Sequence, residues 1–474
     1  MSGFNYEKDA DGIVTVTMDM DGPVNSMNEE YRQCMAETVQ KLQQEDGLTG
    51  VVLASAKKVF FAGGNLHELL ATTEEDIPGF MEVMHRTKAE LRALEKLPVP
   101  VVAAINGAAL GGGFEICLSC NHRIAWNNRS VQLGLPEVTL GLLPGGGGVV
   151  RMVNLLGLQT ALPYLLEGTR VTPDKALAAG MIHETVDTVE ELVPRAKAWI
   201  LENKDNEAAA VQPWDVKGYK IPGGNAAHPA NAQMISVAPA MLYQKTRGLL
   251  PAPAKILDCA IEAARLDLDT ALVVESRGLA HLVVTPQAKN QISTFFFGMN
   301  KVNGGASRPQ EVEPQQTKKV GILGAGMMGQ GIAYVSAMAG IEVVLKDISQ
   351  EAADKGKAYS EKLLARRVER GRMEQAKMDG ILALIKPTAD AADLQGCDLI
   401  IEAVFENMAL KHQITKEMQG YMAEGGVWGS NTSTLPITQL AEAADKPENF
   451  IGIHFFSPVD KMPLVEIILS LIHI

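Results

Sequence analysis

The chain has 474 residues, of which 46% are hydrophobic and 21% charged, and its formal net charge at pH 7 is −13. This composition is typical of a folded globular protein with roughly two or three domains, and it excludes a disordered or fibrous chain. The negative charge, with no basic stripe or arm, argues against a nucleic-acid partner, although an anionic substrate needs only a local basic patch.

The N-terminal sequence MSGFNYEKDADG is polar and contains neither an export signal nor an Arg-rich import sequence. No run of about 18 apolar residues occurs, so no membrane span is predicted. The cysteines are scattered, and Cys117 and Cys120 form a lone CxxC motif inside an apolar run. Without a second pair, we interpret them as buried thiols, predict no metal site, and expect a reduced, cytoplasmic protein.

From Gly12 to about Pro194, short β-branched runs alternate with helical stretches, which predicts an α/β fold. Strands are expected at IVTVTM, GVVLAS and VPVVAAI, and helices at 31–44 and 79–97. Glycine is frequent in the turns, above all at 62–64, 111–113 and 144–148. Such runs allow the backbone to come close to a ligand.

The pattern becomes helical from about Glu190 to Phe297, apart from a long loop expected at 213–233. The polar, Gly- and Pro-bearing segment 301–319 is typical of a linker. We therefore predict three regions along the chain. They are a first domain at 1–190, a helical connector with its linker at 191–310, and a further domain at 316–474.

In the last region, KKVGIL, GAGMMGQGIAYVSAMAG and IEVVLKD predict a strand, a glycine turn opening a helix, and a second strand. CDLIIEAV and NFIGIHFFS are expected as later strands of the same parallel, doubly wound Rossmann-type sheet. Gly324, Gly326 and Gly329 match GxGxxG in this context, and Asp347 ends the second strand. A glycine turn without a ligand is the alternative, but the context favours a dinucleotide site. The carboxylate of Asp347 favours NAD over NADP because it would bind a ribose hydroxyl and repel a 2′-phosphate.

Two glutamates stand beside glycine-rich turns: Glu115 follows Gly111–Gly113, and Glu137 follows a turn containing proline. With FFAGGNL, INGAALGGGFEICLSC and LGLPEVTLGLLPGGGG, they resemble the crotonase (enoyl-CoA hydratase/isomerase) superfamily over about residues 1–190. Over essentially the whole chain, the sequence resembles the multifunctional α-subunits of bacterial fatty-acid oxidation complexes. The resemblance implies a spiral ββα crotonase domain, acyl-CoA thioester substrates, fatty-acid β-oxidation and a bacterial source.

By this resemblance, the backbone N–H groups of Gly64 and Gly112 form an oxyanion hole for the thioester. Glu115 and Glu137 would activate water toward C3 and deliver a proton to C2 of a trans-2-enoyl-CoA, and which of them does which stays open. One carboxylate could also move a proton between C2 and C4, giving a Δ3-Δ2 isomerase. Asn65 departs from the family, because many relatives carry aspartate at this position.

The segments EAVFENMALK, GSNTSTLPI and GIHFFSPVDKMPLVE resemble the L-3-hydroxyacyl-CoA dehydrogenase family. The resemblance implies a catalytic His454 that takes the hydroxyl proton, a partner Glu466 that orients it, and an active-site Ser433. It also implies an NAD site lined by Met328, Val404, Phe405, Glu406, Lys411, Ser433 and Ser457, the last replacing an asparagine of relatives. Other histidines, such as His67, His122 and His281, are expected to be structural or surface residues.

Relatives continue beyond this sequence with helical domains that close the dehydrogenase site, and the final residues LSLIHI do not resemble that continuation. We therefore expect a C-terminally truncated chain whose dehydrogenase activity is impaired. A thiolase is the expected protein partner. Two alternatives stay open: an interaction scaffold, and another crotonase reaction such as isomerisation, thioester hydrolysis or decarboxylation.

Overall fold

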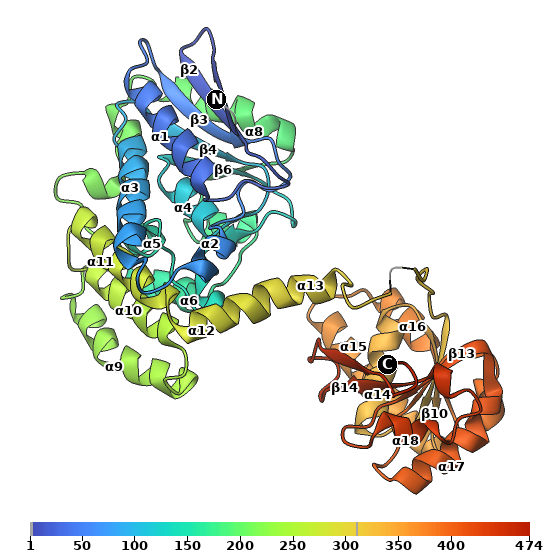
Figure 1. Ribbon diagram of the computed structural model, residues 1–474. Coiled ribbons are helices and arrows are strands. Elements are labelled where there is room, and N and C mark those ends of the chain that lie inside the picture. The colour runs from blue at the N-terminus through green and yellow to red at the C-terminus, as the bar shows by residue number, and fades with distance from the viewer. Residues whose placement is uncertain (1–2, 310) are drawn as a thin grey trace. The chain divides into compact units, whose positions relative to one another are not determined.

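The computed structural model describes residues 3–309 and 311–474 and divides into two compact units, Met1–Arg308 and Pro309–Ile474 (Figure 1). Gln310 of the predicted linker, like the first two residues of the polar N-terminus, lies outside the described residues. Each unit has its own sheet and its own hydrophobic core. In the described part of the chain, no helix has the length and apolar character needed to cross a membrane.

The main sheet of the first unit has the strand order β1-β2-β3-β4-β6-β8 and is parallel except for the β1–β2 pair. Its strands are β1 (Gly3–Lys8), β2 (Ile13–Asp19), β3 (Gly50–Ser55), β4 (Val101–Ile105), β6 (His122–Trp126) and β8 (Glu184–Val186). A small parallel sheet pairs β5 (Ala109–Leu110) with β7 (Leu133–Gly134). The three strands expected in this region are confirmed as β2, β3 and β4.

Helices cover this sheet on both faces, so its strands are buried on both sides (Figure 1). Along β3, Val51 and Leu53 face the larger core, which α1 (Glu29–Gln43) and α3 (Ile77–Glu95) complete. Val52 and Ala54 face the smaller core, which α8 (Leu192–Glu202) covers. This alternation follows from the two-residue period of a strand and explains why the inner strands β3 and β4 are apolar along almost their whole length.

The helices of the predicted connector are part of the first unit. α10 (Pro251–Ala263) packs against α5 (Gly148–Leu156), and α11 (Leu268–Val283) packs against α3 and α5. α9 begins at Pro229, so the loop expected at 213–233 ends earlier than predicted. The other helices of this unit are α2 (Leu66–Ala71), α4 (Gly112–Leu118), α6 (Leu158–Glu167), α7 (Pro173–Ala178), α9 (Pro229–Thr246), α12 (Pro286–Gln291) and α13 (Met299–Asn303), with shorter turns including η1 (Glu137–Leu140) and the π-helical η5 (Ile292–Gly298).

The second unit contains a sheet of order β11-β10-β9-β12-β13-β14-β15, in which only the β14–β15 pair is antiparallel. The strands are β9 (Lys319–Leu323), β10 (Glu342–Lys346), β11 (Ile385–Thr388), β12 (Cys397–Glu402), β13 (Met422–Ser430), β14 (Phe450–Phe455) and β15 (Val465–Ile468). The chain runs outward from β9 to β11 and then returns to β12, beside β9. This reversal is the switch point at which doubly wound folds bind nucleotides.

Helices lie on both faces of this second sheet, as the Rossmann prediction requires (Figure 1). One core includes side chains of α14 (Met327–Met338), α15 (Gln350–Glu369) and α16 (Gln375–Ala383). The core on the other face includes side chains of α17 (Met408–Met418) and α18 (Ile437–Ala441). The predicted α/β class is thus confirmed for this unit.

Asn25 fixes the segment that leads to Gly63 and Gly64 in the first unit. Its side chain is fully buried, accepts a bond from Met20 N at 3.1 Å and donates to Ser55 Oγ at 2.9 Å and to Phe60 O at 3.2 Å. Its own carbonyl accepts the N–H of Ala62 at 2.8 Å. One amide therefore connects the end of β2, the end of β3 and the FFAGG turn.

Replacing Asn25 with alanine should destabilise the first unit by about 2–4 kcal/mol, because several buried polar groups lose their partner together. Hydrogen exchange of the β2 and β3 amides, followed by mass spectrometry, measures this loss. Asn206→Ala, at an exposed position, is the matched control and should leave the exchange unchanged. Equal protection in Asn25→Ala and the wild type would contradict the assignment.

Candidate active sites

The four residues predicted for the first site line one cavity. Gly64, Gly112, Glu115 and Glu137 meet at a cavity of about 210 Å³. Most of its remaining wall is apolar, and includes Leu66, Leu69, Phe80, Val83, Met84, Leu140, Leu142, Leu143 and Leu279. An apolar pocket into which a few polar groups converge is the usual form of a small-molecule site.

Glu115 lies in α4 and is only 2% exposed. Its Oε1 accepts the backbone N–H groups of Gly146 and Gly148, each at 2.7 Å. Gly148 is the first residue of α5, so the carboxylate is bound at a helix N-terminus, where negative charge is favoured. Burial, followed by the charge of Glu275, still raises the pKa of Glu115 to about 7.

Glu137 begins the short helix η1 and is partly buried. Its Oε2 is enclosed and has no hydrogen-bond partner in the described part of the chain. Burial and then repulsion by Glu115 raise the pKa of Glu137 well above its usual range. Gly111, at φ 55°, must be a glycine because a Cβ there would collide with Oε1 of Glu137.

The two carboxylates have different surroundings, although they share a cavity. Glu115 receives two backbone donors that stabilise its charged form, whereas the Oε2 of Glu137 receives none among the described residues. Two buried carboxylates that repel each other retain a proton between them toward neutral pH. The geometry therefore favours a charged Glu115 beside a protonated Glu137.

The predicted oxyanion donors have free N–H groups. Gly112 is the first residue of α4, where backbone N–H groups have no partner within the helix, and its N–H has no acceptor among the described residues. Met27 N donates to Gly63 O at 2.8 Å, and Asn65 N donates to Met27 O at 3.4 Å. Because successive peptide groups of an extended chain alternate in direction, the N–H of Gly64 points away from Met27.

Asn65, where the sequence departs from its relatives, is the N-cap of α2. Its Oδ1 accepts the N–H of His67 at 3.0 Å, and its Nδ2 donates to Glu68 Oε1 at 2.9 Å. An aspartate could make the first bond but has no donor for the second. The asparagine therefore suits the neighbouring Glu68 and holds the start of a helix that lines the cavity.

The sequence did not predict which residues bind the carboxylate of Glu115 on the side away from the cavity, or which residues support them. The PGGGG run at 144–148 signals close backbone approach, but nothing in the sequence says that its N–H groups bind a carboxylate. Arg151 is fully buried, donates through Nη1 to Gly146 O at 2.8 Å, and pairs through Nε with Glu95 at 2.6 Å. Such long-range pairs carry no local sequence signal.

The glycine turn of the second unit has the geometry of a dinucleotide loop. A Cβ on Gly324, which has φ 96°, would lie 2.9 Å from Ala403 O, and one on Gly329 would collide with Gly324 O. Apart from Gly326 and its immediate neighbours in the chain, no atom of the described residues lies within 4 Å of the Cβ position at Gly326. The protein's own backbone therefore requires the first and third glycines, whereas the second faces open space that suits an approaching pyrophosphate.

Asp347 follows β10 and closes this turn. Its Oδ2 accepts the N–H of Ala325 at 2.6 Å, and its Oδ1 accepts the N–H of Ile348 at 2.7 Å. The side chain of Ile348 is 94% exposed, so the surface beside the carboxylate is open. The turn, the N-terminus of α14 and this carboxylate together fit NAD.

Lys411 is 1% exposed and joins two carboxylates. Its Nζ lies 2.7 Å from Glu402 Oε1 and 3.4 Å from Glu406 Oε2. Glu402, which ends β12, also accepts the hydroxyl of Ser430 at 2.8 Å. The sequence interpretation missed Glu402, although a carboxylate ending an apolar strand was a usable signal. The buried lysine therefore stabilises the end of β12 and the residues that follow it, at the switch point of the sheet.

Glu406 holds the loop that carries Ser433. Its Oε1 accepts Thr432 Oγ1 at 2.6 Å, Ser433 N at 2.9 Å and Thr434 N at 3.1 Å. Burial alone would raise the pKa of Glu406, but these hydrogen bonds and the Lys411 charge outweigh it and lower the pKa to about 2. Three predicted residues, Glu406, Lys411 and Ser433, are thus brought together.

His454 and Glu466 face each other across the β14–β15 pair. They are direct partners in the antiparallel register, and His454 Nδ1 lies 2.8 Å from Glu466 Oε2. Twelve residues apart in sequence, they meet because the chain turns back between the two strands. The carboxylate fixes the ring orientation and leaves Nε2 available for a substrate.

The remaining predicted residues lie at the start of α14 or directly after strands of the second sheet. Met328 is in the first turn of α14, and Val404 and Phe405 follow β12. Phe405 is 85% exposed, which is unusual for an aromatic side chain and favours a contact with a ligand. Ser457 follows β14, near His454 in the chain.

Comparisons with known proteins match a different family model to each of the two units. Residues 8–215 match the family model of enoyl-CoA hydratase/isomerase, and residues 319–471 match that of the 3-hydroxyacyl-CoA dehydrogenase NAD-binding domain. The chain is 38% identical over 474 residues to the fatty acid oxidation complex subunit alpha of Shewanella halifaxensis, and 38% identical over 477 residues to that of Shewanella baltica strain OS185. Each alignment covers 98% of this chain and 65% of the relative, so the chain spans about two thirds of the relatives' length.

Among solved structures, the chain is similar to (S)-3-hydroxybutyryl-CoA dehydrogenase PaaH1 from Ralstonia eutropha. The two are 42% identical, with a TM-score of 0.32, over 33% of this chain and 55% of that chain.

Acid should destabilise the second unit partly through Glu406. Because folding lowers the pKa of Glu406 from 4.5 to about 2, its contribution to stability is complete above pH 4.5 and is lost as the pH falls toward 2. In Glu406→Gln, the free energy of unfolding should depend less on pH across this interval, as calorimetry of the full chain can measure. The matched control is Glu417→Gln, which removes an exposed carboxylate from the same unit. A wild-type pH dependence in Glu406→Gln would refute this assignment.

Proposed function

We propose that the chain performs two consecutive steps on acyl-CoA thioesters. The proposal is supported by the match of residues 8–215 to the enoyl-CoA hydratase/isomerase family model and of residues 319–471 to that of the 3-hydroxyacyl-CoA dehydrogenase NAD-binding domain. The first unit hydrates a trans-2-enoyl-CoA to an L-3-hydroxyacyl-CoA. The second unit binds NAD and carries the groups that oxidise this product to a 3-ketoacyl-CoA. Both are steps of fatty-acid β-oxidation.

The hydration site requires donors for a developing enolate oxygen and two groups that handle protons. The N–H groups of Gly64 and Gly112 supply the donors, and each donor of this kind is worth about 3 kcal/mol of barrier. Glu115 and Glu137 face the same cavity and can hold one water between them. This convergence of two free N–H groups and two carboxylates is the observation that carries the proposal.

We assign the proton steps from the surroundings of each carboxylate. Glu115 is stabilised as an anion by Gly146 and Gly148, so it serves as the base that takes a proton from water as oxygen bonds to C3. Glu137, whose Oε2 has no donor among the described residues, carries the proton that is delivered to C2. With a substrate whose double bond lies between C3 and C4, Glu137 in its charged form can take a proton from C2 and return it to C4, which moves the double bond to C2–C3 and gives a secondary isomerase activity.

In the second unit, NAD supplies the hydride acceptor when bound. Gly324, Gly326 and Gly329 with the N-terminus of α14 would hold its pyrophosphate, and Asp347 its ribose hydroxyl. His454 takes the proton of the substrate hydroxyl, and Glu466 stabilises the ring that becomes positively charged. Ser433, positioned by Glu406, would bind the substrate oxygen.

The relatives' name describes a subunit of a complex, which supports a further part of the proposal: a thiolase that consumes the 3-ketoacyl-CoA as protein partner, in the bacterial cytoplasm. Affinity purification of the full chain co-expressed with a thiolase from the same genome tests this. Recovery of the thiolase in fixed ratio is expected. A pure scaffold would require this interaction but not the two carboxylates.

Hydration of crotonyl-CoA, followed by loss of the enoyl-thioester absorbance, tests the first activity. Glu115→Gln and Glu137→Gln should each lower kcat by about a hundredfold or more, because each removes one proton-transfer group. Glu184→Gln, which removes a carboxylate paired with Arg195, is the matched control and should retain activity. A folded but inactive wild type, or variants as active as the wild type, would refute the proposal in favour of a scaffold or another reaction.

Binding of NAD tests the second site without requiring its catalysis. Asp347→Asn should raise the dissociation constant for NAD about tenfold, the effect of losing one charge-assisted hydrogen bond worth about 1.5 kcal/mol. Isothermal titration calorimetry measures the constant. Asp379→Asn, which changes an exposed carboxylate bonded to Gln375, should bind NAD as the wild type does. Unchanged affinity in Asp347→Asn would remove Asp347 from the site.

A further inference from the structure

The α3–α11 contact places a third carboxylate behind the hydration site. Glu275 in α11 is 0% exposed, and α11 lies outside residues 8–215 that match the hydratase family model. Its Oε2 accepts the N–H of Val150 at 3.2 Å, and its Oε1 lies 2.9 Å from Lys88 Nζ. A fully buried carboxylate is costly unless it is paired in this way.

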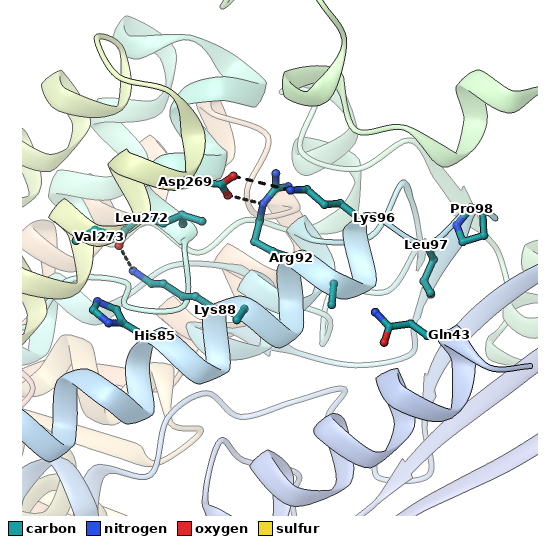
Figure 2. A pocket seen from close by; sticks show the side chains of 12 residues that line it. Gln43, His85, Lys88, Arg92, Lys96, Leu97, Pro98, Asp269, Leu272 and Val273 are labelled. Carbon is teal, nitrogen blue, oxygen red and sulfur yellow. Dashed lines mark hydrogen bonds and ion pairs between the residues drawn. The ribbon is translucent and has the colours of Figure 1, made fainter.

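Lys88 reaches Glu275 from α3. It is 4% exposed, and besides the ion pair its Nζ donates to Leu272 O at 2.7 Å and to Ser276 Oγ at 2.9 Å. Figure 2 shows Lys88 directed from α3 toward Leu272, beside a cavity of about 590 Å³ along the same contact. With three partners, the lysine has a single well-defined position.

Glu275 and Glu115 bind the same helix end. Glu115 accepts the N–H groups of Gly146 and Gly148, and Glu275 accepts that of Val150, two residues further into α5. The N-terminal turn of α5 therefore carries two negative charges, of which Lys88 offsets one. A change in either member of the Lys88–Glu275 pair must change the electrostatic potential at Glu115.

We propose that Glu275, held by Lys88, is a positioning residue for hydration: it fixes the N-terminal turn of α5 and sets the charge state of Glu115. This inference rests on the proposed hydratase function. Burial and then the Glu275 charge raise the pKa of Glu115, whereas Lys88 and Arg151 lower it. Among the described residues, the other titratable groups that interact with Glu115 or Glu275 include Glu137 of η1, Tyr31 of α1 and Cys259 of α10. Arg151, which interacts with both carboxylates, is itself paired with Glu95 of α3.

We expect substitutions of Glu275 and Lys88 to shift the pH profile of kcat/KM in opposite directions, for crotonyl-CoA hydration by the full chain. Glu275→Gln leaves the positive Lys88 beside Glu115 and should move the acid limb to lower pH by about 1 unit. Lys88→Met leaves the negative Glu275 and should move it to higher pH by a similar amount. The double variant Lys88→Met/Glu275→Gln, which buries no unpaired charge, should return the limb toward the wild type.

Glu184→Gln, which breaks an ion pair away from the cavity, is the control and should leave the profile in place. If the acid limb does not move in either single variant or moves the same way in both, the pair has only a structural role and the inference is wrong, whatever happens to stability. If one of the two single variants does not fold, the pH profiles of the other single variant and of the double variant can still be compared with that of the wild type.

A readout without catalysis separates this inference from the proposed function. The infrared band of protonated carboxyl groups can be titrated in the wild type and in Glu275→Gln, each against its Glu115→Gln counterpart. A shift of the Glu115 titration to lower pH in Glu275→Gln supports the inference even if the wild type does not hydrate crotonyl-CoA. An unshifted titration overturns it even if hydration is confirmed.

Discussion

The hydrogen bonds that Gly146 and Gly148 donate to Glu115 are the constraint on which the first unit depends. They require α5 to begin at Gly148 with its N–H groups turned into the core, and they require α4 to deliver a carboxylate there without side chains in between. A Cβ on Gly146 would lie 2.8 Å from Glu115 Oε2, and one on Gly148 2.7 Å from Oε1. The close approach of the buried carboxylate therefore requires glycine at these positions. α10 and α11 pack against α5.

The second unit uses the same physical solution for a different purpose. There too a glycine turn precedes a helix N-terminus, but the turn of Gly326 faces open space instead of a buried carboxylate. In the first unit the protein supplies its own anion to the helix end, whereas in the second the helix end is left for an anionic cofactor. The difference follows from what lies opposite the turn: a packed helix in one unit, and the switch point of the sheet in the other.

Much of this organisation is predictable from the sequence, because it rests on local patterns. The apolar runs identify β2, β3, β4, β9 and β10, and the GxGxxG spacing with Asp347 identifies the dinucleotide turn. The motifs predict that Glu115 lies with Glu137 and that His454 lies with Glu466, and the structure brings each pair together. The pair Lys88–Glu275 escaped prediction, because charged residues in helices are ordinarily exposed and no pattern marks those that are buried. Glu402, the partner of Lys411, was also missed, although it ends an apolar strand. The packing of the helices after residue 191 was also not predicted. Their amphipathic pattern shows that one face of each helix is buried, but it does not show which part of the protein that face contacts.

The place of Glu466 on β15 has a consequence for motion. β15 is the outermost strand of its sheet, pairs with β14 alone among the described strands, and exposes Val465 and Ile467. Edge strands with few buried contacts open locally at a free energy well below that of global unfolding. Each opening would release the His454 ring from its carboxylate while the rest of the sheet stays intact. The fraction of molecules with a correctly oriented imidazole is therefore set by the local stability of one short strand.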